Sequence, residues 1–428
     1  MSVRIVWTDV PEDCENGVAE KSFFEELGEC DLGGVPEDGM AKNFLIKADN
    51  LPVLKDFAKK GVKVDFIYID PPYNTGNDFV YKDNFSEDYW LSFMNRRLLA
   101  AREILKSEGV IFIAIDQNEL YALKLLCDSI FGAKNFVNDF MWLHGKGKKD
   151  KWSRTLQQHT LCYAKDKSKL LPFEEIEFSQ WATANADNDV RGNWFSGSIS
   201  FSEKRSNKNH KNYYSITSPS GKVWTRQWLV SKEEMDKLIE ENLIFWGAAP
   251  DFNGVPRKKI FNGTATKVIP KNVISQVQST RAAQNHLNEI LCEKWDLDTE
   301  SGGVDTKCCL DTESGGVDTK FCLDTNGGAL DSVSNKKTIS ATFENPKPVD
   351  LILHFLNIVQ LPENAVILDF FAGSGTTFEA VCELNNRKKS NCKCILIQKE
   401  ENNIAEICKR RCQKVAAAYK QEINFINF

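Results

Sequence analysis

The chain has 428 residues, 42% of them hydrophobic, which is enough for about two or three domains with sizeable cores. No apolar run approaches the ~18 residues of a membrane span, and the N-terminus lacks the basic-then-apolar pattern of a signal peptide. We therefore expect a cytoplasmic protein without membrane segments. The formal net charge of −6 argues against a polyanionic partner only if charge is evenly spread.

Charge is strongly segregated along the chain. Residues 1–40 contain 11 acidic and 2 basic side chains. Residues 144–285 contain 23 Lys and Arg against 14 Asp and Glu, an excess of +9. This central region is expected to face a polyanion such as nucleic acid. The acidic N-terminal segment is expected to be either disordered or an arm for a partner.

The first informative element is a strand expected over 64–69, an apolar run followed at once by Asp70-Pro71-Pro72-Tyr73. An amino nitrogen on a heteroaromatic ring is a poor nucleophile, so acceptors must hold its hydrogens. Asp70 offers a carboxylate, and Pro72 fixes the Pro71 carbonyl in extended backbone as a second acceptor. Tyr73 offers a flat face for an unstacked base. The alternative is a strand that simply ends in a proline-rich turn.

Residues 41–143 alternate strand and helix patterns. A helical pattern that includes Leu98 and Ile104 precedes a strand over 110–115, and a second helical pattern begins at Leu120. This alternation predicts βαβ units and a parallel sheet.

Basic residues of the central region gather in two groups, with aromatic rings between them. The groups are Lys146, Lys148, Lys149, Lys151 and Arg154 around Trp152, and Lys204, Arg205, Lys208, His210 and Lys211 beside Tyr213 and Tyr214. Such cations can neutralise phosphates, and the rings can stack on bases. The candidates for reading base edges are Arg191, Asn193, Arg226, Gln227 and Arg257. A solvated basic loop is the alternative, and these residues alone favour neither interpretation.

Residues 286–342 are expected to form a linker with a thirteen-residue tandem repeat. LDTESGGVDTKCC at 297–309 is followed by LDTESGGVDTKFC at 310–322 and by a decayed third copy. This period fits neither helix nor strand, which favours an exposed loop. Recurring aspartates leave calcium binding as an alternative, although the spacing of a known calcium loop is missing. The thirteen cysteines include no CxxC pair, so free thiols and no metal site are expected.

A glycine turn near the C-terminus is the partner of the first motif. The expected strand 365–371 runs into Phe371-Ala372-Gly373-Ser374-Gly375, and a helix is expected over 376–385. Glycines let a ligand approach the backbone, and a helix start presents free N–H groups. The other elements expected in this half are a helix over 349–358, a strand over 393–398 and a helix over 401–418. One such turn is weak support for a nucleotide site, but the pair of motifs is strong.

With both motifs in place, the chain resembles the beta-class DNA amino-methyltransferases, and most closely the modification subunits of type III restriction-modification systems. The residues that carry the resemblance are Ile67 to Gly76, Asp78 to Tyr81, Asp83 to Phe85, Phe93-Met94, Arg97-Leu98, Gly109 to Asp116, Phe343 to Pro348 and Phe371 to Gly375. In that class the catalytic motif comes first and the cofactor turn last, as here. The resemblance implies an α/β fold in which residues 41–143 and 343–428 form one doubly wound methyltransferase sheet. The target-recognition domain, 144–285, is inserted between them.

The resemblance also implies S-adenosylmethionine as cofactor. Its methionine part is expected at the turn, with Asp369 near the ammonium and Lys347-Pro348 closing over the cofactor. Asp49 should meet the adenine amino group, with Ala48 where the family has glycine. Glu400 or Glu401 could hold the ribose, with a plain helix cap as the alternative. The full predicted set for the cofactor is Asp49, Lys347, Pro348, Asp369, Phe371, Ala372, Gly373, Ser374, Gly375, Thr376 and Glu400. The predicted DNA-binding set is Lys146, Lys148, Lys149, Lys151, Arg154, Lys204, Arg205, Lys208, Arg226 and Arg257.

These expectations amount to direct methyl transfer to adenine N6 in double-stranded DNA, with no covalent intermediate and no metal. Cytosine N4 is an alternative target, although the family's cytosine enzymes usually carry Ser where Asp70 stands. The rival classes are a DNA-binding regulatory protein without turnover and a methyltransferase acting on RNA or protein. No Gly-x-x-x-x-Gly-Lys-Ser/Thr loop is present, so a restriction subunit would be a separate chain. A homodimer and a solitary enzyme are further options.

Overall fold

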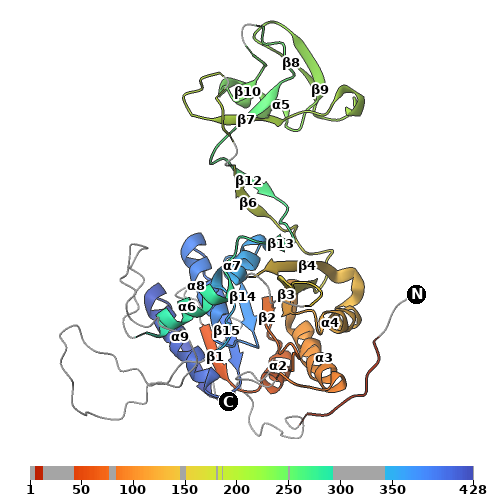
Figure 1. Cartoon of the computed structure of the whole chain (residues 1–428). Helices are drawn as coiled ribbons and strands as arrows, with labels where there is room; N and C mark the ends of the chain where they lie inside the picture. The colour runs from red at the N-terminus through yellow and green to blue at the C-terminus, as the bar shows by residue number, and fades with distance from the viewer. Residues whose placement is uncertain are drawn as a thin grey trace, which may run out of the picture. The chain divides into compact units, whose positions relative to one another are not determined.

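The computed structural model describes residues 5–12, 43–76, 83–144, 151–179, 182–185, 187–248, 251–292 and 343–427. It contains two compact units (Figure 1). The first comprises Met1–Pro172 and Lys271–Phe428, and the second comprises Phe173–Pro270. Within the described ranges, no helix has the length and apolar character needed to cross a bilayer.

A nine-stranded sheet forms the centre of the first unit. Its order is β13 (Val273–Ile274), β4 (Phe136–Leu143), β5 (Gln157–Ala164), β3 (Leu105–Ile115), β2 (Val64–Ile69), β14 (Val366–Asp369), β15 (Lys393–Gln398), β1 (Asn43–Lys47) and β16 (Ile423–Asn427). Neighbouring strands of this sheet are parallel except where β5 pairs with β3 and β4. Strands β14 and β15 lie between β2 and β1, so the two halves of the chain interleave.

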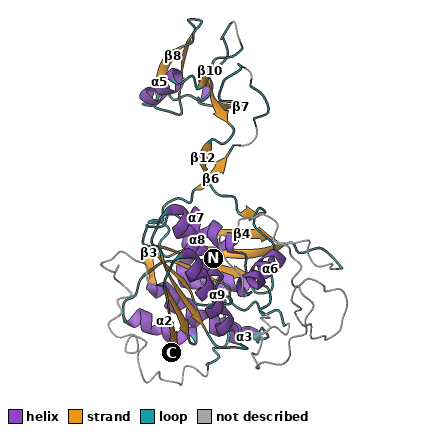
Figure 2. Ribbon diagram, turned by 90° about the vertical axis from the view of Figure 1, so that its left-hand side faces the viewer, coloured by secondary structure: helices purple, strands orange, loops and turns teal. Residues whose placement is uncertain are grey.

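Helices cover both faces of this sheet (Figure 2). They are α2 (Asn50–Lys59), α3 (Glu87–Ile104), α4 (Leu120–Cys127), α6 (Thr280–Leu291), α7 (Val349–Ile358), α8 (Thr376–Lys388) and α9 (Ile404–Tyr419). Ile67 and Ile69 of β2 belong to the core with α2, α3 and α4. Tyr68 of the same strand points the other way and packs on Phe355 of α7. Alternation along a strand thus assigns each face its own helical layer.

Local sequence explains where these elements begin and end. Strand β2 is buried on both faces and is therefore an almost continuous apolar run. Helix α3 begins after Ser86, whose hydroxyl accepts the Tyr89 N–H, and acidic residues occupy its first turn. Gly375 adopts a φ of +85° at the start of α8. A side chain there would be strained, and its Cβ would lie 3.1 Å from the sulfur atoms of Cys408 and Cys412.

The doubly wound α/β fold is confirmed, and several predicted bounds agree with the structure. The helix 349–358 and the strand 393–398 are found as predicted. The predicted strand 365–371 ends earlier, at Asp369, and the predicted helix 401–418 begins later, at Ile404. The second unit is shorter than the predicted region 144–285, because β5 and α6 belong to the first unit.

The second unit consists of small sheets and one helix. Its elements are β6 (Glu175–Phe178), β7 (Trp194–Ser198), β8 (Tyr213–Thr217), β9 (Val223–Gln227), α5 (Lys232–Glu240), β10 (Ile244–Phe245), β11 (Arg257–Phe261) and β12 (Ala265–Val268). Trp228, Met235 and Trp246 contribute to its own hydrophobic core. A hydrophobic core of this kind indicates an inserted domain rather than a loop.

Candidate active site

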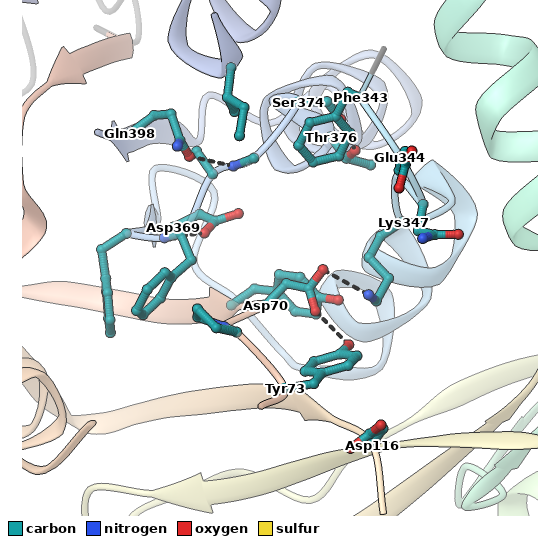
Figure 3. A pocket seen from close by; sticks show the side chains of 18 of the residues that line it. Asp70, Tyr73, Asp116, Phe343, Glu344, Lys347, Asp369, Ser374, Thr376 and Gln398 are labelled. Atoms are coloured by element: carbon teal, nitrogen blue, oxygen red, sulfur yellow. Dashed lines mark hydrogen bonds and ion pairs between the residues drawn. The ribbon is translucent and has the colours of Figure 1, made fainter. Parts of the chain in front are cut away.

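A cavity of about 800 Å³ opens where the central strands of the first unit end. Four polar side chains that line it come from four adjacent strand ends. Asp70 follows β2, Asp369 ends β14 and Gln398 ends β15 (Figure 3). Asp49 lies just beyond β1. The carboxyl ends of parallel strands are the usual ligand site of such sheets. The two predicted motifs therefore face one cavity, as the sequence implied.

The first motif builds a compact polar cluster around Asp70. The Tyr73 hydroxyl donates to Asp70 Oδ1 at 2.6 Å, and Lys347 Nζ donates to Oδ2 at 2.7 Å (Figure 3). The same ammonium lies 5.1 Å from the centre of the Tyr73 ring. Trp90 Nε1 donates to the Pro72 carbonyl at 2.9 Å and fixes the backbone. Because each carboxylate oxygen has a further lone pair, Asp70 can still accept hydrogens from a ligand.

A hydrogen-bonded turn holds this cluster in place. Asn74 has a φ of +57°, and Asp83 accepts its N–H at 2.8 Å and that of Thr75 at 3.0 Å. The Asn74 amide donates to Glu119 at 2.8 Å and accepts the Phe85 N–H. Asn tolerates this left-handed conformation better than most residues. These hydrogen bonds join residues 74–75 to residues 83–85 without regular secondary structure.

The second motif surrounds a buried carboxylate. Asp369 accepts the Phe371 N–H at 3.0 Å and the Thr377 hydroxyl at 2.5 Å. Burial raises the pKa of Asp369 to about 7, against the effect of these hydrogen bonds. Gly373 adopts a φ of +54° and donates its N–H to Gln398 Oε1 at 2.7 Å. A Cβ on Gly373 would lie 3.0 Å from the Phe343 ring, so the narrow turn requires glycine.

Behind the turn lies an ion-pair network that the sequence did not reveal. Arg411 donates to Glu379 at 2.7 Å, to the Thr376 hydroxyl at 2.8 Å and to the Ser374 hydroxyl at 3.1 Å. His286 lies 2.6 Å from the other oxygen of Glu379. Burial alone would raise the pKa of Glu379, but Arg411 and His286 hold it below its usual value. The network ties α6, α8 and α9 to the glycine turn.

A second buried arginine organises the Asp49 side of the cavity. Arg97 donates to Glu12 at 2.8 Å, to Asn50 at 2.5 Å and to Asp49 at 3.2 Å. The Asn50 amide donates to the Phe370 carbonyl at 2.6 Å, which connects α2 to the glycine turn. All five residues line the cavity.

Glu12 belongs to a short N-terminal segment, residues 5–12, that packs along α3. Val10 N–H donates to Ser92 Oγ at 3.0 Å, and Arg96 pairs with Asp9 at 2.9 Å. No sequence pattern places this segment at the cavity, and residues 13–40 lie outside the described ranges. A usable signal was Arg97 itself, because it shares the apolar stripe of α3 with Met94.

Most predicted site residues line the cavity. They are Asp49, Asp70, Pro72, Tyr73, Lys347, Asp369, Phe371, Ala372, Gly373, Ser374 and Thr376. Pro71 is buried, Pro348 is the N-cap of α7 and Gly375 is the N-cap of α8, and none of the three belongs to the lining. Glu400 pairs with Lys47 at 2.7 Å, whereas Glu401 lines the cavity. Of the two predicted alternatives for the ribose, the geometry thus favours Glu401.

The predictions about metal sites and cysteines can be compared with the described part of the chain. Within it, no three or more His, Cys, Asp or Glu side chains lie where they could hold a metal ion together. Its cysteines, such as Cys127 and Cys394, are free thiols. The repeat of residues 297–322, with its calcium alternative, lies outside the described ranges.

Comparison with known proteins identifies the family. A sequence model described as DNA methylase matches residues 64–409, which include both motifs. The chain belongs to the DNA methylase family. The StyLTI Mod subunit of a type III restriction-modification enzyme from Salmonella typhimurium is 29% identical over 446 residues, covering 93% of this chain and 60% of the relative. The type II methyltransferase M.KpnI from Klebsiella pneumoniae is 28% identical, covering 85% of this chain and 82% of its own.

The chain also aligns with solved structures. The M1.HpyAVI complex with S-adenosylmethionine aligns with a TM-score of 0.36 at 13% identity, over 86% of this chain and 98% of its own. This score is low, so the fold rests on the chain's own strands and helices. The chain spans 60% of the length of the StyLTI subunit. The activity and partners of that whole subunit are therefore not assigned to this chain by similarity alone.

Proposed function

We propose that the chain transfers a methyl group from S-adenosylmethionine to adenine N6 in double-stranded DNA, as the modification component of a restriction-modification system. One observation carries the proposal. The Asp70 cluster and the Asp369 glycine turn line the same cavity, at the ends of neighbouring strands β2 and β14. Family membership and the type III Mod relatives support the choice of substrate.

The residues present fit the cofactor. The Gly373 turn leaves a space that a Cβ would narrow against Phe343, and a buried carboxylate, Asp369, offers a counter-charge for a cationic ligand. Asp49 lines the same cavity, where it could accept a hydrogen bond from an adenine amino group. When bound, S-adenosylmethionine supplies an electrophilic methyl group on a sulfonium. Asp369, Gly373 and Asp49 are the residues proposed to hold it.

The protein's proposed contribution to the reaction is to position the target amino group. A target adenine that leaves the duplex would place its amino group against Asp70, whose carboxylate accepts the hydrogens and turns the nitrogen lone pair towards the methyl carbon. Lys347 Nζ pairs with that carboxylate at 2.7 Å and helps to fix its position. The Pro71 carbonyl is the proposed second acceptor. Tyr73 is the proposed stacking ring, and its hydroxyl also orients Asp70.

The cytosine-N4 alternative remains chemically close, because cytosine presents a similar amino group. Asp at position 70 favours adenine on the family pattern. The experiment incubates the purified chain with S-adenosylmethionine and DNA and then identifies modified nucleosides by mass spectrometry. N6-methyladenine is expected. Detection of N4-methylcytosine would support the cytosine alternative instead. The absence of any modified base, on every duplex DNA tested, would contradict the proposal.

The second unit is the proposed DNA-recognition domain. Lys204 and Arg205 are exposed on a short helical turn, and Lys208 is exposed just beyond it. Lys222 Nζ lies 4.1 Å from the centre of the Trp224 ring, and the Arg226 guanidinium carbon lies 5.3 Å from the same ring centre. Cations beside aromatic rings suit phosphate and base contacts.

Some of the other predicted DNA-contacting residues lie within the described ranges, and some lie outside them. In the first unit, Lys151 lies 4.9 Å from the centre of the exposed Trp152 ring, and Arg154 is exposed. Arg257 donates to the Ser196 carbonyl at 3.0 Å. The remaining lysines of the first basic group lie outside the described ranges: Lys146, Lys148 and Lys149.

Replacing Lys204 and Arg205 together by alanine should weaken binding to all duplexes alike. If each contacts one phosphate, the slope of log affinity against log salt should fall by roughly two. The measurement is a salt titration with a methylatable and a scrambled duplex. Lys232→Ala, on the same unit but paired with Asp236, is the control. An unchanged slope with altered sequence preference would instead assign the pair to base readout.

Cofactor affinity should depend on pH through Asp369. In the free protein its pKa is about 7, and a bound cation would favour the ionised carboxylate. Below pH 7, binding must therefore expel a proton, and the Kd for S-adenosylmethionine should rise by up to about tenfold per pH unit. Above about pH 8 it should be flat. Calorimetry between these limits tests the profile, and Asp369→Asn should flatten it. A wild-type Kd independent of pH would contradict this role.

The proposed partners follow the same family reasoning. Double-stranded DNA is the substrate, a restriction subunit would be a separate chain, and a homodimer is a further option. A cytoplasmic location accords with this substrate.

A further inference from the structure

Tyr68 presents a buried hydroxyl with no assigned role. The residue is 1% exposed, and its side chain lines the cavity. Among the described residues, its hydroxyl has no hydrogen-bond partner. Leaving a buried hydroxyl without a hydrogen-bond partner destabilises the folded protein. Such an orphan at a cavity wall indicates a group that is completed by a ligand.

The strand register places this hydroxyl beside the buried carboxylate. In the parallel pair of β2 and β14, Ile67 lies opposite Leu368, so Asp369 follows beside Tyr68. Side chains at such adjacent positions point to the same face of a sheet. The Tyr68 ring stacks on Phe355, with centroids 6.3 Å apart, which fixes its direction.

Electrostatics determine what the hydroxyl can do. Burial, Asp70 and Asp369 all raise the pKa of Tyr68 well above its usual value. The phenol therefore stays protonated and is available as a hydrogen-bond donor. Its partner must be an acceptor on the ligand.

Depth in the cavity indicates which part of a ligand this is. Tyr68 and Asp369 are 1% and 3% exposed, whereas the Asp70 side chain is 29% exposed. The hydroxyl thus belongs with the deep Asp369 end rather than with the outer site for the amine. At that end the proposed cofactor places its amino-acid part. The ammonium there has no lone pair, and the lone pair of the positively charged sulfonium is a very poor hydrogen-bond acceptor, so the acceptor is the carboxylate.

We propose that the Tyr68 hydroxyl donates a hydrogen bond to the α-carboxylate of the S-adenosylmethionine held beside Asp369. The inference rests on the proposed cofactor. Asp369 then meets the positive group and Tyr68 the negative group of one amino-acid end. Together they recognise a zwitterion at the floor of the cavity.

The test compares S-adenosylmethionine with decarboxylated S-adenosylmethionine, which lacks only the carboxylate, on wild type and on Tyr68→Phe. A hydrogen bond to a charged group is worth about 1.5–3 kcal/mol, or about 10- to 150-fold in affinity. In calorimetry, Tyr68→Phe should lower the affinity for S-adenosylmethionine by roughly this factor. It should lower the affinity for the decarboxylated compound by less than about twofold. Tyr163→Phe is the matched control, since that buried hydroxyl donates to Asp128 and does not line the cavity.

Three outcomes would overturn the inference. Equal wild-type affinity for the two ligands would do so without any variant. Unchanged binding of the full cofactor to Tyr68→Phe, or equal losses for both ligands, would show that the hydroxyl does not contact the carboxylate. If wild type binds neither ligand, the proposed cofactor itself fails, which is a distinguishable result.

Discussion

Replacing Asp70 by asparagine is expected to lower kcat for methyl transfer by about 10³-fold or more, while the Kd for S-adenosylmethionine stays within about tenfold. Asparagine keeps the shape but loses the charge that accepts the amine hydrogens. The structure adds a reason, because Asp70 is the partner of Lys347 at 2.7 Å. With Asn at this position, the Lys347 ammonium is left facing the target amine and repels the positive charge that develops on it.

The measurement is single-turnover methylation with calorimetry in parallel. Asp236→Asn, the same chemical change at an exposed site, is the control and should behave as wild type. Lys347→Met completes a double-mutant cycle with Asp70→Asn. Because the two groups contact each other, their effects should not add. Near-normal turnover in Asp70→Asn would refute the catalytic role.

Replacing Arg411 by methionine should lower the free energy of unfolding by about 3–5 kcal/mol, because it leaves Glu379 as an uncompensated buried charge. Arg411 is 1% exposed. The change should also weaken cofactor binding, since the Ser374 and Thr376 hydroxyls of the glycine turn lose their donor. Urea denaturation followed by circular dichroism measures the first effect.

The exposed pair Lys232–Asp236 provides the control. Lys232→Met should change stability by no more than about 0.5 kcal/mol, as is usual for surface pairs. Glu379→Leu in the Arg411→Met background should restore part of the loss, because no charge then remains unpaired. A small effect of Arg411→Met alone would show that Glu379 is protonated or reached by water.

Sequence patterns predicted those parts of the fold that depend on local burial. Strand β15 is a run of apolar residues between polar ends, and helix α7 follows a proline with apolar residues on most sides. Such patterns fix an element before any contact is known. The short strand β1 was not predicted, because its pairing with β15 and β16 joins segments about 350 residues apart.

Sequence analysis predicted those parts of the candidate site that lie within the two motifs. The motifs placed Asp70 and Asp369 correctly in one cavity, because chemistry at strand ends is local. They did not show that Lys347, expected over the cofactor, pairs with Asp70 across 277 residues of sequence. The resemblance included Arg97 but gave it no role, and the motifs did not show Arg411; the buried charges of both are satisfied by partners from distant elements. A charged residue within the apolar stripe of a helix would have been the signal for these buried ion pairs.

The extent of the insertion was misjudged for a related reason. Basic composition extends across residues 144–285, but composition does not distinguish a sheet strand from a domain beside it. Strand β5 carries buried Leu161, Cys162 and Tyr163 and pairs with β3 and β4. A run of buried residues within a basic region was the better guide to the boundary.

The interleaved order of the central strands has a consequence for biosynthesis. Strands β2 and β1 are made early, but β14 and β15 must fill the places between them. Until residues 366–398 leave the ribosome, β1 has no strand to pair with, because both of its neighbours, β15 and β16, belong to the C-terminal part of the chain, and the walls of the cavity cannot face one another. Early termination thus yields chains that lack the pocket altogether rather than chains with a weakened one, and the ability to hold a ligand arrives in a single step.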